Sequence, residues 1–216
     1  MRYARRMALD RLIVGTSGNV SVRVGDRIVI TPGSRDYDSL TPNDVSVVLL
    51  TGDRLAGPPP SSELPLHLAI HESMAVDGSA VVHVHSKFAT VLSSLGIGLP
   101  AVHYQIAALG GPIRIADYAT FGTPELAQSV VAALDGRRAA LMANHGSVAV
   151  GESLAEAFRH ASTLEWMCSV YYSARLIGAP NILDDAELTQ VRSQQARFSQ
   201  ERAEWAAEGG QKSAQP

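Results

Sequence analysis

Two histidines at the end of an apolar run are the first residues in the chain whose spacing suggests chemistry. His83 and His85 lie in the stretch SAVVHVHSKF, residues 79–88. On a β-strand, residues i and i+2 project from the same face, so this pair can offer two imidazoles to one metal ion. The spacing alone does not decide the question, because two histidines at a strand end can equally bond to backbone groups and water.

Two other segments could supply the missing ligands of such a site. His145, in ANHGS, lies in a tight glycine-containing turn that could aim its ring at the end of the sheet. Glu63, in PSSE, begins an expected helix and would complete a set of three nitrogens and one oxygen. That set suits Zn²⁺ or another borderline divalent ion better than Mg²⁺ or Ca²⁺. Taken singly, each residue is more typical of a turn or a helix start, so the metal site is a hypothesis that requires all four to meet.

A competing pair of histidines lies in HLAIH. His67 and His71 are spaced i, i+4 on one helix face, with Glu63 one turn earlier. The HExxH pattern of zinc proteases does not occur here. We therefore expect histidines at the helix surface or the edge of the core, and we interpret His103 and His160 as structural in the same way.

Three loops are built from small and hydroxyl-bearing residues: 14–23 (VGTSGNVSVR), 31–34 (TPGS) and 60–63 (PSSE). Small residues let backbone N–H groups approach an anion, and hydroxyl or amide side chains add hydrogen bonds. Neither GxxxxGK[ST] nor GxGxxG is present in these loops. Together they could cradle one phosphate with neutral donors, although turns that need glycine dihedrals would explain them as well.

The elements that must position these residues can be predicted from periodicity and turn signals. Residues 19–33 (NVSVRVGDRIVITPG) and 44–57 (DVSVVLLTGDRLAG) each contain a strand pair, joined at GD and at TGD, which is typical of antiparallel hairpins. Further strands are expected at 80–85 and on either side of NHG in 139–151. Helices are expected at 2–14, 63–75, 86–96, 123–136, 153–177 and 185–208, with residues 209–216 as a disordered tail. The pattern predicts one mixed α/β domain with helices outside a largely antiparallel sheet.

The composition limits the classes of binding partner and the cellular compartment that we expect. The chain has 216 residues, 46% of them hydrophobic and 18% charged, and a formal net charge of −3, which gives no reason to expect nucleic acid or an anionic membrane as partner. No apolar stretch approaches the ~20 residues of a membrane span. Cys168 is the single cysteine, so no intrachain disulfide can form, which fits a cytoplasmic protein.

Seven motifs, in order, resemble the class II aldolase/epimerase family, which also includes the adducin head. They are GTSGNVSVR, ITP, PSSE, VVHVHS, HYQIAALGG, YATFGT and NHG, and the resemblance covers about residues 5–180. It implies a three-layer α/β/α domain over residues 1–208, with a mixed, mainly antiparallel sheet. It also implies a homotetramer with active sites between subunits.

The implied activity is a metal-dependent aldolase that reversibly cleaves a ketose 1-phosphate. The substrate would be L-fuculose 1-phosphate or a related deoxy-pentulose 1-phosphate, split through a metal-stabilised enediolate into dihydroxyacetone phosphate and an aldehyde. No lysine Schiff base is required, so Lys87, which follows the metal-site strand, is interpreted as a surface residue.

Carried over by position, the resemblance makes His83, His85 and His145 the ligands of one Zn²⁺ per subunit, with Mn²⁺ or Co²⁺ as alternatives. Glu63 would ligate the metal in the empty site and act as acid/base once substrate displaces it, which would call for a pKa nearer neutrality. Tyr104 matches a tyrosine that helps protonate the leaving aldehyde oxygen. The phosphate-cradling positions are Thr16, Gly18, Asn19, Ser61 and Ser62, together with Gly33 and Ser34 in the loop where the family usually reads TPxG.

The aldehyde end is matched less closely. Phe121 corresponds to an apolar residue near the aldehyde, whereas Phe198 stands near the position of a family tyrosine that reaches a neighbouring subunit, which favours a less polar substrate tail. The family's epimerases carry an aspartate that HYQIAALGG lacks, and Asp117 does not align with it. Its decarboxylases tend to carry lysine where this chain has Ser62. A non-catalytic, adducin-like member would be expected to lose the metal ligands, which are all present here.

Overall fold

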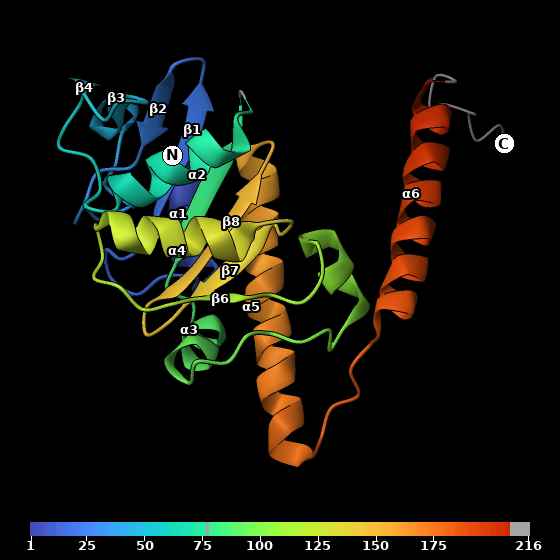
Figure 1. The fold of residues 1–216 in the computed structure, drawn as a ribbon. Helices are drawn as coiled ribbons and strands as arrows, with labels where there is room; N and C mark the ends of the chain where they lie inside the picture. The colour runs from blue at the N-terminus through green and yellow to red at the C-terminus, as the bar shows by residue number, and fades with distance from the viewer. Residues whose placement is uncertain (77, 208–216) are drawn as a thin grey trace, which may run out of the picture.

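An eight-stranded sheet is the centre of the computed structural model, which describes residues 1–76 and 78–207 (Figure 1). Its order within the described residues is β4-β3-β2-β1-β5-β8-β7-β6, and every neighbouring pair is antiparallel except β6 and β7. The strands are β1 (Asn19–Val24), β2 (Arg27–Ile30), β3 (Ser46–Leu49), β4 (Arg54–Ala56), β5 (Ala80–Val84), β6 (Ile115–Ala116), β7 (Ala139–Met142) and β8 (Gly146–Gly151). The predicted mixed, mainly antiparallel sheet is confirmed.

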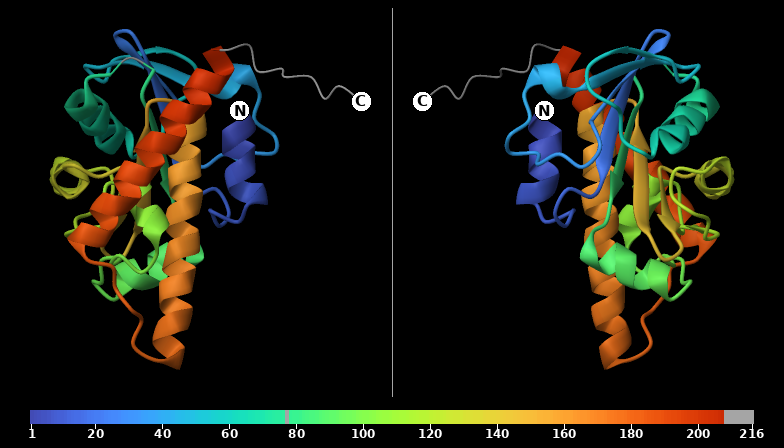
Figure 2. Two further views of the ribbon diagram at one scale, coloured as in Figure 1. Left: turned by 90° about the vertical axis from the view of Figure 1, so that its right-hand side faces the viewer. Right: turned by 90° about the vertical axis from the view of Figure 1, so that its left-hand side faces the viewer.

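Two layers of helices cover the sheet, so the predicted three-layer α/β/α arrangement is also confirmed (Figure 2). One face carries α2 (Leu64–Met74) and α4 (Pro124–Leu134), and the other carries α1 (Arg2–Leu9), α3 (Lys87–Ser94) and α5 (Leu154–Ile177). Short 3-10 helices lie at Pro42–Asp44 and Tyr104–Leu109. The last helix, α6 (Asp185–Ala207), lies outside these layers (Figure 1).

Alternation along β5 decides which residues face which layer. Val82 packs in the cluster that includes α5, whereas Val81 packs in the cluster that includes α2 and α4. Because side chains alternate along a strand, His83 shares the face of Val81 and points towards α2. On the neighbouring strand β1, Asn19 pairs with His83 and Ser21 with Val81, so these two polar side chains share that face as well.

The boundaries differ from the prediction mainly at the N-terminus. The expected helix 2–14 ends at Leu9, because Arg11 adopts a left-handed backbone conformation and turns Leu12 into the core. The helix expected at 63–75 begins at Leu64, with Glu63 at the capping position but making no capping bond through its carboxylate. The tail expected at 209–216 lies outside the described residues. None of the described helices is long and apolar enough to cross a membrane.

His67 and His71 differ from their predicted location at the helix surface or core edge. Both are fully buried and point from α2 towards β1, where the Ser21 hydroxyl lies 2.6 Å from His67 Nδ1 and 2.8 Å from His71 Nε2. Burial, followed by the nearby His71 and His83 rings, lowers the pKa of His67 to about 3. Burial, followed by Arg23, lowers that of His71 to about 4. Both rings are therefore neutral in the folded chain at pH 7.

The turn between β7 and β8 depends on a glycine. A Cβ on Gly146 would lie 2.5 Å from the carbonyl oxygen of Val84 on β5. We predict that Gly146→Ala lowers the free energy of unfolding by ~1–3 kcal/mol, because β8 must shift away from β5. Denaturant titration measures this loss, with Gly178→Ala as control, since a Cβ there meets no atom within 4 Å. Equal stability of the two variants would contradict the prediction.

The two buried histidines predict a pH dependence of stability. In the unfolded chain they bind protons near pH 6.5, whereas in the folded chain they do so only near pH 4 and 3. The unfolded state therefore binds more protons in this window, so the free energy of unfolding falls as pH drops from about 6.5 to about 4.

His67→Gln removes one of these groups and should make that fall shallower in denaturant titrations at several pH values. Ser46→Ala, which removes a buried hydroxyl bonded to the Pro58 carbonyl, should lower stability without changing the slope. A His67→Gln slope identical to that of the parent chain would refute the assignment.

Candidate metal and anion site

Four predicted residues meet at one end of the sheet. The ligand atoms of Glu63, His83, His85 and His145 all lie within 4.8 Å of one another. His83 Nε2 is 2.9 Å from His85 Nε2 and 3.0 Å from Glu63 Oε2, and His145 Nε2 is 3.3 Å from Glu63 Oε1. The fold thus brings together the set in which the sequence suggested three nitrogens and one oxygen.

The four side chains are positioned by three segments of the chain. His83 is on β5, and His85 follows the last residue of that strand. His145 occupies the turn before β8, where Asn144 takes a left-handed conformation and the His145 N–H bonds to the Met142 carbonyl. Glu63 stands at the N-terminus of α2. These segments meet because β5 pairs with β8 and because α2 packs on the sheet.

The donor set fits a divalent cation. His83 Nδ1 lies 3.0 Å from the Ser147 carbonyl, which can only accept, so Nδ1 carries the proton and the Nε2 lone pair faces the cluster. Glu63 Oε1 is buried and has no hydrogen-bond partner among the described residues. A cation at this point would satisfy that oxygen and the three ring nitrogens together.

The pKa values of His85, His145 and Glu63 are shifted towards the protonation states that a cation requires. Burial, followed by the neighbouring rings, lowers the pKa of both His85 and His145 to about 4. Burial alone would raise the pKa of Glu63, but His83, the Asn19 amide and His145 outweigh it and hold that pKa well below its ordinary value. Glu63 is therefore an ionised carboxylate, and its pKa lies below the ordinary value, whereas the acid/base role had called for a pKa nearer neutrality.

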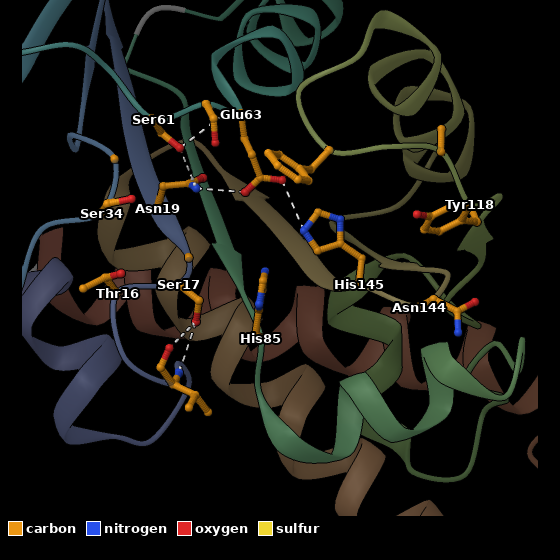
Figure 3. A pocket seen from close by; sticks show the side chains of 16 residues that line it. Thr16, Ser17, Asn19, Ser34, Ser61, Glu63, His85, Tyr118, Asn144 and His145 are labelled. Carbon is orange, nitrogen blue, oxygen red and sulfur yellow. Dashed lines mark hydrogen bonds and ion pairs between the residues drawn. The ribbon is translucent and has the colours of Figure 1, made fainter.

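A cavity of about 520 Å³ opens beside this cluster (Figure 3). All three small-residue loops contribute to its wall, and none of its lining residues is lysine or arginine. The lining residues are Val14, Thr16, Ser17, Gly18, Asn19, Gly33, Ser34, Ser61, Ser62, Glu63, His85, Tyr118, Ala119, Phe121, Asn144 and His145. Every residue predicted to cradle phosphate is among them.

Backbone contacts hold the three loops together. The Ser61 N–H donates to the Thr31 carbonyl at 3.2 Å, and Pro32 forms a β-bridge with Pro60. The buried Tyr37 hydroxyl donates to the Gly18 carbonyl at 2.5 Å, which ties the first loop to the segment after the second. These ties bring segments from three separate parts of the chain around one cavity.

The loops leave hydrogen-bond donors available. Ser61 Oγ accepts from Asn19 Nδ2 at 2.9 Å and from the Glu63 N–H at 3.3 Å, so its own proton remains free to donate. Within the described residues, no hydrogen bond engages the backbone N–H groups of Gly18, Gly33 or Ser62. The N-terminus of α2 begins two residues after Ser62, and its dipole also favours an anion.

The apolar end of the cavity was predicted only in part. Phe121 lines it, as expected, and is 61% exposed. Val14 and Tyr118 also line the cavity, and no role was predicted for either. Tyr118 belongs to the YATFGT motif and could have been found there, whereas Val14 carries no sequence signal. Ser17, Ala119 and Asn144 were missed as well.

Other expected residues lie outside the cavity. Tyr104 begins a 3-10 helix, is 51% exposed and does not line the cavity of its own chain. Phe198 lies on α6, against a different hollow. Lys87 is an exposed residue at the start of α3, as expected. His103 caps the 3-10 helix and His160 Nδ1 donates to the Val150 carbonyl, so both are structural, as predicted.

Comparison with known proteins identifies the family of the chain. Residues 1–172 match the family described as class II aldolase and adducin N-terminal domain. A 5-methylthioribulose-1-phosphate/5-deoxyribulose-1-phosphate aldolase of Rhodospirillum rubrum is 41% identical over 191 residues, 87% of this chain and 85% of that protein. The L-fuculose phosphate aldolase of Escherichia coli strain K12 is 40% identical over 179 residues, 82% of this chain and 83% of that protein.

A solved structure of an L-fuculose 1-phosphate aldolase superimposes with a TM-score of 0.85 at 37% identity, covering 89% of this chain and 92% of that one. The match therefore extends over fold and sequence at once, and it spans the segments that carry Glu63, His83, His85 and His145. This chain belongs to the class II aldolase and adducin N-terminal domain family.

Proposed function

We propose that this protein is a divalent-metal-dependent aldolase that reversibly cleaves a ketose 1-phosphate to dihydroxyacetone phosphate and an aldehyde. The observation that carries the proposal is the juxtaposition of three imidazoles and a carboxylate with a cavity built from anion-compatible loops. Family membership and the names of the aligned relatives support the same reaction class. We further propose a cytoplasmic homotetramer.

Glu63, His83, His85 and His145 would hold one Zn²⁺ per subunit, and Mn²⁺ or Co²⁺ could take its place. When bound, the ion supplies Lewis-acid stabilisation of negative charge that develops on substrate oxygens. The remaining steps belong to the chain's own side chains.

The phosphate would lie against the three loops. Ser61 can donate its free hydroxyl proton, and the unengaged N–H groups of Gly33 and Ser62 can donate to further phosphate oxygens. With no lysine or arginine in the wall, binding relies on directed neutral donors and the α2 dipole. Such a site holds the phosphate end in one orientation and so fixes the position of the reacting carbons.

Glu63 would move the proton at C3 of dihydroxyacetone phosphate. In condensation its carboxylate takes that proton, and in cleavage it returns one to the same carbon. The ionised state of this carboxylate in the buried site suits the first of these steps. Tyr104 lies outside the cavity of its own chain and would act in the site of a neighbouring subunit. In condensation it would give a proton to the aldehyde oxygen, which becomes a hydroxyl, and in cleavage it would take that proton back.

The tail of the substrate would be apolar. Val14, Tyr118 and Phe121 present exposed apolar surface at the cavity wall, and Phe198 would add more from a neighbouring subunit. The nearly equal identities to a deoxyribulose-phosphate aldolase and a fuculose-phosphate aldolase do not separate the substrates. The cavity wall favours 5-deoxy or 5-methylthio pentulose 1-phosphates over substrates with hydroxylated tails.

Metal binding is tested by stripping the protein with a chelator and titrating Zn²⁺. We expect one ion per chain, and a loss of metal affinity of at least about tenfold for His145→Ala, because one of four ligands is removed. His103→Asn changes a histidine outside the cluster and should bind as the parent chain does. Equal affinity in both variants would contradict the ligand assignment.

The reaction is tested with a panel of ketose 1-phosphates, following dihydroxyacetone phosphate through a coupled NADH assay. The panel holds the L-fuculose, D-ribulose, 5-deoxyribulose and 5-methylthioribulose compounds, with L-ribulose 5-phosphate as a control for epimerisation. We expect metal-dependent cleavage, fastest with the two apolar tails, and a fall in kcat of about a hundredfold or more in Glu63→Gln. Preference for hydroxylated tails would refute the specificity. A zinc-loaded protein that cleaves none of them would refute the reaction.

A further inference from the structure

A continuous row of buried polar side chains runs from Glu63 away from the cavity, between α2 and β1. Asn19 Nδ2 lies 3.0 Å from Glu63 Oε2, and Asn19 Oδ1 contacts His67 Nε2. Beyond that point the Ser21 hydroxyl bridges His67 Nδ1 to His71 Nε2, and His71 Nδ1 lies 3.0 Å from the Ser79 hydroxyl. The members, all buried, are Glu63, Asn19, His67, Ser21, His71 and Ser79.

The matching repeats of a helix and a strand explain how the row forms. Positions 63, 67 and 71 are spaced by four and share one face of α2, advancing ~6 Å each time. Positions 19 and 21 share one face of β1 and lie ~6.6 Å apart. The spacing along the helix and the spacing along the strand are therefore nearly equal, so each of the two strand side chains lies between two side chains from the helix segment.

The chemistry of the groups gives the row a single direction. The ionised Glu63 carboxylate can only accept, so the Asn19 atom facing it must be the NH₂ group. Asn19 Oδ1 then faces His67 Nε2 and needs a proton from it. A neutral His67 with its proton on Nε2 has an acceptor at Nδ1, which the Ser21 hydroxyl satisfies.

The same logic continues to the end of the row. Having donated to His67, Ser21 Oγ accepts from His71 Nε2–H. That leaves His71 Nδ1 as an acceptor for the Ser79 hydroxyl. The lowered pKa values of both rings agree with neutral imidazoles. All four ring nitrogens have partners inside the row, so these histidines are not available as a second set of metal ligands.

We propose that His67, Ser21, His71 and Ser79 are positioning residues that lock the Asn19 amide with its NH₂ group towards Glu63 and Ser61. A flipped amide would set Oδ1 against the Glu63 carboxylate and would remove a donor from Ser61 as well. The row thus controls the orientation of the carboxylate and of the hydroxyl that faces the cavity. The row itself stands on geometry, and only its effect on turnover rests on the proposed function.

The direction of the row is tested by nitrogen-15 NMR of histidine-labelled, zinc-loaded protein. Long-range couplings between ring nitrogens and ring protons distinguish the two neutral tautomers from the cation. We expect His67 and His71 both to carry the proton on Nε2 at pH 7, with signals assigned by their loss in His67→Gln and His71→Gln. A proton on Nδ1 of either ring, or a cationic ring, would overturn the proposal.

The effect on Glu63 is tested by the kinetics of two substitutions at one position. Glutamine can present an N–H near the place of His67 Nε2, whereas leucine cannot. We expect His67→Gln to keep kcat within about threefold of the parent and His67→Leu to lose at least about tenfold. Ser21→Ala, which breaks the row at its centre, should resemble the leucine variant.

Ser46→Ala is the matched control, because Ser46 lies in the same cross-strand row as Ser21, two strands away, and its buried hydroxyl is outside the polar row. It should keep the kcat of the parent. Equal losses in His67→Gln and His67→Leu would reduce His67 to a packing role and overturn the positioning claim. If the parent protein cleaves no ketose 1-phosphate, the proposed function is wrong. The proposed direction of the hydrogen bonds in the row is then tested by the NMR tautomers alone.

Discussion

The convergence of three imidazoles and one carboxylate in a buried space is the constraint on which this structure depends. Bringing Glu63 out of water costs free energy unless its charge is matched. The Asn19 amide donates to one carboxylate oxygen, yet the other is left without a hydrogen bond among the described residues. A bound cation would satisfy this oxygen, whereas without one the buried, unpaired oxygen costs free energy of folding. The sheet, the α2 helix and the β7–β8 turn can be understood as the means of holding it.

The polar groups around the cluster are organised in two different ways. On the cavity side, the Ser61 hydroxyl and several backbone amides are left with donors to offer. On the core side, the row through His67 and His71 is satisfied at every ring nitrogen. A satisfied network in a low-dielectric interior is rigid, because breaking any bond leaves a buried group unpaired. Asn19 joins the two regions, because its amide contacts Ser61 and Glu63 on one side and His67 on the other.

The anion pocket is also unusual in its electrostatics, because its wall contains no cationic side chain. Under the proposed function, recognition of a phosphate there would rest on the direction of neutral donors and on a helix dipole, and a bound metal would contribute positive charge nearby. Directed donors discriminate by geometry, which suits a site that must hold one end of a substrate still while a carbon–carbon bond breaks. The exposed apolar side chains of Val14, Tyr118 and Phe121 offer no directed hydrogen bonds, so under the proposed function they would tolerate variation of the substrate tail.

Much of this protein could be predicted from its sequence, because the signals are local. Alternation and turn residues predicted the hairpins, and the Thr123–Pro124 pair predicted the start of α4. Ordered motifs predicted the family, the four cluster residues and the three loops. The early end of the first helix was missed, because the helical spacing of apolar residues continues past Leu9 while the backbone turns at Arg11.

Only the tertiary structure decided how distant groups meet. His67 and His71 were expected at a surface or edge, since helical spacing says nothing about which strand a helix face will cover. Their burial follows from the packing of α2 on β1. Side chains four residues apart on the helix have nearly the same spacing as side chains two residues apart on the strand. The depressed pKa of Glu63, the neutral state of the buried rings and the place of Tyr118 in the cavity arise in the same way. They depend on distances between segments, which residue spacing along one chain does not contain.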